Sequence, residues 1–91
     1  MKMFCVYDIK AEAYLTPFFM MNDKVAMRAF GDMANNEEHM FNKHPTDYAL
    51  MEIGVYDEET GKVEQKENHT HLGVAAEYIA TQIKKEVMNE V

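Results

Sequence analysis

The sequence is short of cysteine, of long apolar runs and of basic residues, and each shortage excludes a class of protein. The single cysteine, Cys5, cannot form an internal disulfide, and its apolar neighbours predict a buried thiol. No apolar run approaches the ~18 residues that a membrane-spanning helix needs, so we expect no membrane contact. Asp8 and Lys10 interrupt the first apolar stretch too early for a secretory signal. These features fit a reducing cytoplasm.

Basic residues number nine against 16 acidic ones, which gives a net charge of −7. Residues 1–45 carry five basic and six acidic residues, a net of −1, whereas residues 46–91 carry four and ten, a net of −6. Affinity for DNA depends largely on neutralised phosphates. The surface as a whole therefore cannot be a nonspecific polyanion binder, and any DNA contact is expected in a local patch of the first half. Elsewhere the acidity favours solubility.

The 91 residues are expected to form one domain, 1–91. Apolar residues in residues 3–8 lie on both alternating faces, which predicts a central strand. A turn over residues 8–12 leads to a short second strand over residues 13–16. Pro17 lacks a backbone N–H, so that strand is expected to end there or to lie at an edge.

A helix is predicted to begin at Asn22 or Asp23, either of which can accept a hydrogen bond from the first turn. The predicted helix ends at Asn35–Asn36 and has one apolar stripe, made of Ala26, Ala29, Phe30 and Met33. Residues 37–47 then form a polar loop, which Met40 and Phe41 are expected to anchor.

Residues 48–56 alternate as a strand, and residues 57–62 suit a turn that closes a hairpin with a left-handed Gly61. Residues 62–67 are predicted to return as a polar edge strand. Thr70 is a candidate cap for a last helix with an apolar face made of Ala76, Ile79, Ala80, Ile83 and Val87. The order β-β-α-β-β-α predicts an α+β fold, a small antiparallel sheet with two helices on one face.

No catalytic motif or phosphate-binding loop is present, so we expect no enzyme and no cofactor. His69 and His71 could share one face of a strand and chelate a metal. Two histidines without a third ligand are weak support, and a loop or cap role is preferred, so no metal site is predicted. The acidic residues 57–59 lack the spacing of a calcium loop and are interpreted as a solvated turn.

The segment 13–30 concentrates aromatic and basic side chains in an otherwise acidic chain. Aromatic rings that stack on bases, beside cations that hold phosphates, are the pattern of single-strand binding. The candidate nucleic-acid-binding residues are Lys10, Tyr14, Phe18, Phe19, Lys24 and Arg28. The alternative for the aromatic residues is burial in the core of the domain, and exposure of the apolar block 17–21 would instead favour a second subunit there.

Five blocks, in order, carry a resemblance to a known family. They are Tyr7-Asp8-Ile9-Lys10-Ala11, Pro17-Phe18-Phe19, Arg28-Ala29-Phe30, Pro45-Thr46-Asp47-Tyr48 and Ile53-Gly54-Val55-Tyr56-Asp57. Over about two-thirds of its length the chain resembles the small non-structural protein of gokushovirus-type microviruses (Microviridae), which are single-stranded DNA phages. The resemblance implies a DNA-binding protein that acts in genome replication or packaging in the host cytoplasm, and it supplies no catalytic residues.

The leading hypothesis is therefore a non-enzymatic phage protein that contacts single-stranded DNA. The alternative is an acidic homo-oligomer that binds a host or phage protein through residues 17–21 or through the last helix.

Overall fold

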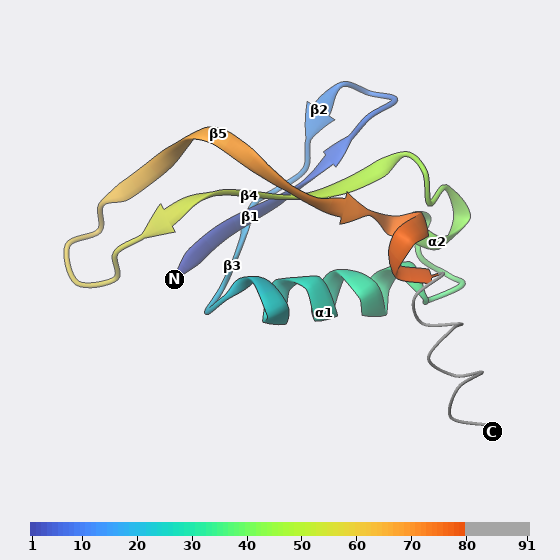
Figure 1. Ribbon diagram of the computed structural model, residues 1–91, viewed down its shortest axis with the longest axis horizontal. Coiled ribbons are helices and arrows are strands. Elements are labelled where there is room, and N and C mark those ends of the chain that lie inside the picture. The colour runs from blue at the N-terminus through green and yellow to red at the C-terminus, as the bar shows by residue number, and fades with distance from the viewer. Residues whose placement is uncertain (80–91) are drawn as a thin grey trace.

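The computed structural model describes residues 1–79, which form a five-stranded antiparallel sheet with helices packed against one face (Figure 1). This confirms the predicted α+β class. The elements are β1 (Lys2–Asp8), β2 (Ala13–Tyr14), β3 (Phe18–Met20), α1 (Asp23–Ala34), α2 (Met40–Lys43), β4 (Tyr48–Tyr56) and β5 (Val63–Val74). Residues 75–79 are also helical. The sequence did not predict β3 or α2.

Strand β1 is central, as its two apolar faces predicted. The sheet order is β2-β1-β4-β5, and β3 also pairs with β1. β2 pairs with the end of β1, at Tyr7 and Asp8, whereas β3 pairs with its beginning, from Lys2 to Phe4. Residues 13–20 thus follow one edge of β1, and Pro17 interrupts them because it has no N–H to donate.

The β4–β5 hairpin has the predicted turn. β4 spans the predicted residues, and Gly61 has a φ of +73°, the left-handed conformation that glycine adopts without steric cost. The Gly61 N–H donates to the Asp57 carbonyl at 2.8 Å, and the Asp57 N–H donates to the Lys62 carbonyl at 2.9 Å. β5 continues to Val74, well beyond the predicted end at residue 67.

This longer β5 shows that the prediction for Thr70 was wrong. Thr70 pairs with Glu52 of β4 in the sheet and caps no helix. The partners of residues 70–74 are the first residues of β4, so ladder hydrogen bonds satisfy the backbone there. The last helix starts only at Ala75. Ile79 packs against the core as predicted, while Ala80, Ile83 and Val87 lie outside the described residues.

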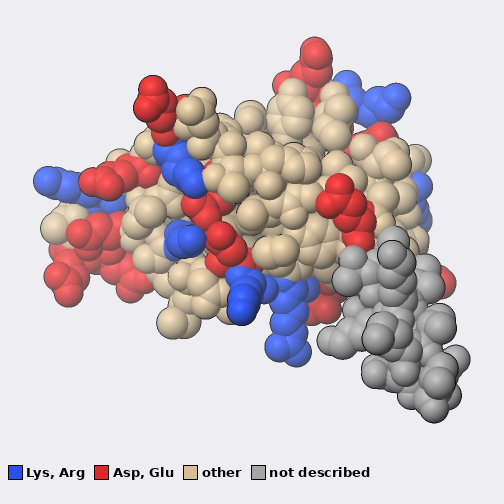
Figure 2. Space-filling model, viewed as in Figure 1, with Lys and Arg blue, Asp and Glu red and all other residues tan. Residues whose placement is uncertain are grey.

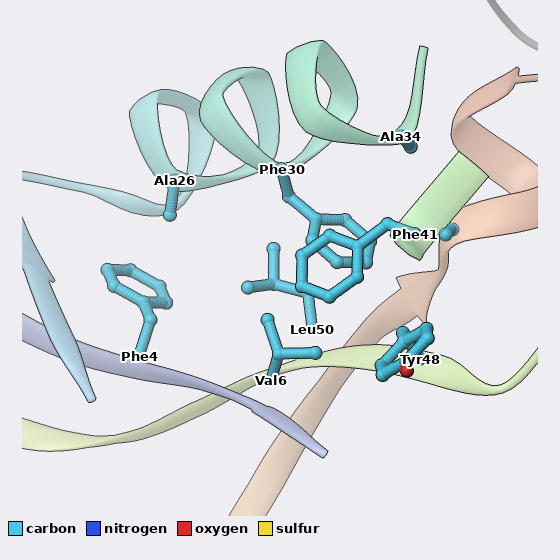
Figure 3. Close-up of a cluster of buried hydrophobic side chains, with 9 residues drawn as sticks. Phe4, Val6, Ala26, Phe30, Ala34, Phe41, Tyr48 and Leu50 are labelled. Carbon is cyan, nitrogen blue, oxygen red and sulfur yellow. The ribbon is translucent and has the colours of Figure 1, made fainter. Parts of the chain in front are cut away.

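The core lies between α1 and the face of the sheet that this helix covers. Phe4, Val6 and Leu50 point from the sheet toward α1 (Figure 3). Ala26 and Phe30 on the predicted stripe are fully buried, but the stripe continues through Ala34, whereas Ala29 and Met33 are only partly buried. The other core residues are Phe41, Tyr48 and Ala75.

The ends of α1 lie close to their predicted positions. The Asn22 side chain caps the helix and accepts a hydrogen bond from the Val25 N–H at 2.9 Å, and Asn35 is the C-terminal cap. In the following loop Phe41 is buried and serves as the predicted anchor, but Met40 is exposed. Phe41 therefore fixes α2 against the core without help from its neighbour.

Candidate nucleic-acid interface

The six candidate residues do not form one surface. Lys24 and Arg28 are exposed on α1. Each comes two positions before a buried residue that faces the sheet, Ala26 and Phe30 respectively. At about 100° per residue, both cations point away from the sheet. They therefore lie on the opposite side of the molecule from any ring on the other face of the sheet.

Phe18 and Phe19 are neighbours on β3, and they point to opposite faces, as alternation in a strand requires. Phe18 pairs with Phe4, and their rings lie 5.8 Å apart in the partly buried margin of the core. Phe19 pairs with Met3 on the other face and is 43% exposed. Only Phe19 is therefore available to a ligand without unfolding.

Lys10 and Tyr14 belong to the β1–β2 hairpin. Lys10 is exposed in the turn, and Tyr14 pairs with Tyr7 across the hairpin with the ring centroids 4.7 Å apart. Tyr14 is 49% exposed. Lys10 and Tyr14 are therefore the two predicted residues that place a cation and an exposed ring on the same hairpin.

The sheet face that carries no helix, which we call the open face, is curled. Tyr14 of β2 reaches His69 of β5 although β1 and β4 separate these strands in the sheet. The Tyr14 hydroxyl and His69 Nδ1 share a hydrogen bond of 3.0 Å, and the two rings meet edge to face. The outer strands therefore approach each other above the middle of the sheet.

The concave middle of the open face contains a groove of about 360 Å³. Its lining consists of Met3, Cys5, Tyr14, Leu15, Pro17, Ile53, Val63, Gln65 and His69. The Cys5 thiol donates to the Leu15 carbonyl at 2.7 Å, and burial raises the pKa of this thiol. Cys5 is buried, as the sequence predicted, and it contributes to the floor of the groove.

Two groups of aromatic rings lie on the open face. Tyr7, Tyr14 and His69 form one group, and Phe19 and Tyr56, with ring centroids 5.5 Å apart, form the other. Sequence reasoning selected Tyr14 and Phe19 but missed their partners. Alternation along the central strand predicts that Tyr7 and Val6 lie on opposite faces. No local sequence pattern predicts that residues 56 and 69 lie beside Phe19 and Tyr14.

Cations near the sheet are largely neutralised by acidic partners. Lys2 Nζ lies 3.0 Å from Asp23 and 3.2 Å from Glu52, and Lys66 Nζ lies 2.9 Å from the other oxygen of Glu52. Figure 2 shows basic and acidic side chains interspersed over the face in view, without a continuous basic stripe. Phosphate contacts would therefore be few.

The described residues contain no group of three or more His, Cys, Asp or Glu side chains that could hold a metal ion. His69 is in a strand, where it contacts Tyr14, and not in the loop or cap that the sequence suggested. Within residues 1–79 no helix is long and apolar enough to cross a membrane.

Comparison with known proteins places the chain in a family. No curated protein and no solved structure matches it. The family model described as Phage ORF5 protein matches residues 1–78. Since that match covers most of the 91 residues, the chain belongs to the Phage ORF5 protein family and is a phage protein.

Proposed function

We propose that this chain is a non-structural phage protein that binds single-stranded DNA on its open face, without catalysis, during genome replication or packaging. The observation that carries the proposal is the exposure of two rings, Tyr14 and Phe19, on a sheet face that no helix covers. Membership of a phage protein family, together with the resemblance to the microvirus protein, supports a role on a phage genome.

Stacking supplies most of the expected affinity. A base stacked on an aromatic side chain contributes about 1–3 kcal/mol and requires no particular sequence. The Tyr7 ring packs against Tyr14, and the Tyr56 ring packs against Phe19. These contacts hold the two exposed rings in place before a base arrives. Such preorganisation reduces the entropy lost on binding.

Phosphate contacts supply less. Of the predicted cations, Lys10 is on the hairpin that carries Tyr14, whereas Lys24 and Arg28 are on the far side of α1. Each phosphate contact with single-stranded DNA contributes a slope of about −0.7 to log K against log salt. With Lys10 as the one contact, we therefore expect a shallow slope of about −0.7, which substitution of Lys10 should largely remove.

The test is fluorescence anisotropy with a labelled oligo(dT) of about 20 nucleotides at several salt concentrations. Tyr14→Leu and Phe19→Leu should each weaken binding by at least about fivefold, the lower end of the stacking range. Lys24→Glu combined with Arg28→Glu is the matched control for the opposite side of the molecule. If that double variant abolishes binding and the ring variants do not, α1 is the DNA surface and the open face is not. Absence of binding by the unaltered protein at low salt would refute DNA binding altogether.

Self-association is a second candidate function, favoured by one observation at the β3 edge. Met21 is 76% exposed, directly after a strand that has a partner only on its β1 side. Phe19 and Val25, both exposed, lie close to it in sequence. An apolar edge of this kind suits a second copy or another phage or host protein.

Light scattering tests this candidate by measuring the mass of the particle in solution. A homo-oligomer would give a mass well above 10.6 kDa, the mass of one chain. Met21→Ser combined with Val25→Ser should then return the protein to the monomer mass, and Phe18 should be left intact because it packs against the core. A monomer mass at high protein concentration would exclude the homo-oligomer.

A further inference from the structure

We propose that the groove of the open face holds one unpaired nucleobase of the bound strand. This inference rests on the proposed function, and it adds a site with its own lining and its own specificity. The groove, about 360 Å³ in volume, lies within the range of roughly 300–1,000 Å³ that is typical of small-molecule sites. It is formed entirely by described residues of β1, β4, β5 and the segment that contains Tyr14, Leu15 and Pro17.

The floor and walls of the groove favour a flat, neutral and largely apolar occupant. Met3, Cys5 and Ile53 form apolar parts of the surface in the middle strands, while Leu15 and Val63 lie on opposite outer segments. No carboxylate, ammonium or guanidinium group is among the lining residues. A charged ligand would lose its hydration there without gaining a counter-charge, whereas a nucleobase is uncharged at neutral pH.

Three polar side chains at the groove provide the hydrogen-bonding groups that such a ligand needs. They are the Gln65 carboxamide and, already hydrogen-bonded to each other through Nδ1 of the imidazole, the Tyr14 hydroxyl and the His69 imidazole. A few polar groups set in an apolar lining are the usual composition of a site that orients a small ligand. The carboxamide of Gln65 carries both donors and an acceptor, so it can pair with the edge of an unstacked base.

The position of the groove fits a strand that already contacts the rings. Tyr14 forms part of the lining, and its hydrogen bond with His69 connects the two outer strands at that point. Phe19 pairs in the sheet with Met3, another lining residue. A nucleotide in the groove would therefore lie between Tyr14 on one side and Phe19 on the other. The neighbouring bases of the strand can stack on these two rings.

A second protein molecule fits the groove less well. A stable interface involves about 20–30 residues on each partner, whereas only nine residues line the groove. Met21, at the exposed edge that suits self-association, is not among the lining residues. A nucleobase needs only the groove itself, and this difference decides between the two occupants.

The groove predicts base selectivity beyond the modest preference that stacking on rings gives. Affinity for oligo(dT), oligo(dA) and oligo(dC) of equal length should differ, and Gln65→Leu should change at least one of the ratios by about fivefold or more. Gln65 is exposed, so the variant should fold normally. Asn68→Leu is the matched control, because Asn68 is an exposed amide on the same strand and is not a lining residue.

A crosslinking experiment locates the base independently of affinity. An oligonucleotide with one 5-iododeoxyuridine is bound to the protein, and the complex is irradiated. The protein is then digested, and mass spectrometry identifies the residue attached to the oligonucleotide. Attachment to Met3 or His69 supports the proposal. Attachment only to the stacking rings Tyr14 and Phe19, or only to α1 residues, overturns it. Binding with unchanged base ratios in Gln65→Leu refutes the groove site and leaves DNA binding on the rings intact. Failure of every oligonucleotide to bind refutes both proposals, and a mass that doubles only while the groove is intact assigns the groove to a second copy.

Discussion

Glu52 offers the sharpest test of how the sheet is held together. This carboxylate is only 7% exposed and joins three strands: Lys2 of β1 lies 3.2 Å from one oxygen and Lys66 of β5 lies 2.9 Å from the other. Hydrogen bonding with the Asp23 carboxyl, then with Lys66 and Lys2, lowers the pKa of Glu52 to about 2. The ionised form is therefore the one that the fold stabilises.

Glu52→Gln keeps the shape of the side chain and removes its charge. Loss of one partner from a fully buried ion pair costs about 3–5 kcal/mol, and both lysines here are about one-third exposed and partly screened. We therefore expect the free energy of unfolding to fall by about 2 kcal/mol at pH 7. Urea denaturation followed by circular dichroism measures it, and Glu67→Gln, an exposed acid of β5, is the control.

The pH dependence of the difference between the two proteins checks the cause. Because the pKa of Glu52 is lower in the folded chain than its ordinary value of 4.5, its contribution is fully present above pH 4.5. The contribution is lost as the pH falls through about 2. The lowered pKa limits it to about 3 kcal/mol. The stability gap between the unaltered protein and Glu52→Gln should therefore narrow between these two pH values. A gap that stays constant down to pH 2, or one below about 0.5 kcal/mol at pH 7, would refute the reasoning.

Substitutions at four further positions have expected outcomes that follow from local geometry. Gly54→Ala should prevent stable folding or destabilise the chain by at least about 2 kcal/mol in urea denaturation, because the added Cβ would lie 2.4 Å from the backbone oxygen of Glu64. Phe18→Ala should lower thermal stability by about 3 kcal/mol, whereas Phe19→Ala, half-exposed on the open face, should cost about 1 kcal/mol or less; equal losses would contradict the assignment of the two faces. Asn22→Ala should cost about 1 kcal/mol and Asn22→Asp almost nothing, since the aspartate keeps the acceptor for the Val25 N–H.

The regular elements were predictable where their patterns are local. β4 alternates over its full length, its turn contains Asp57 and Gly61 at informative positions, and Asn22 caps α1 as expected. The end of β5 was not predictable, because residues 68–74 contain polar and apolar side chains without strict alternation. Their strand conformation depends on pairing with β4, which is a tertiary interaction.

The candidate site was predictable only residue by residue. Sequence spacing showed that Lys24 and Arg28 share one side of a helix, and that side proved to be exposed. Sequence spacing could not show which face of the sheet α1 would cover. Because α1 covers the face opposite the exposed rings, Lys24 and Arg28 are separated from Tyr14 and Phe19. The contact between Tyr14 and His69 joins residues 55 positions apart through the curl of the sheet, so no local pattern records it.

The acidic charge of the chain and the proposed binding of DNA are compatible if the rings, and not the cations, supply the affinity. A net charge of −7 repels a phosphate backbone at long range. Attractive contacts are few, because Lys2 and Lys66 are engaged by Glu52. Added salt would screen both the long-range repulsion and these few contacts. Affinity should then depend little on salt and strongly on Tyr14 and Phe19.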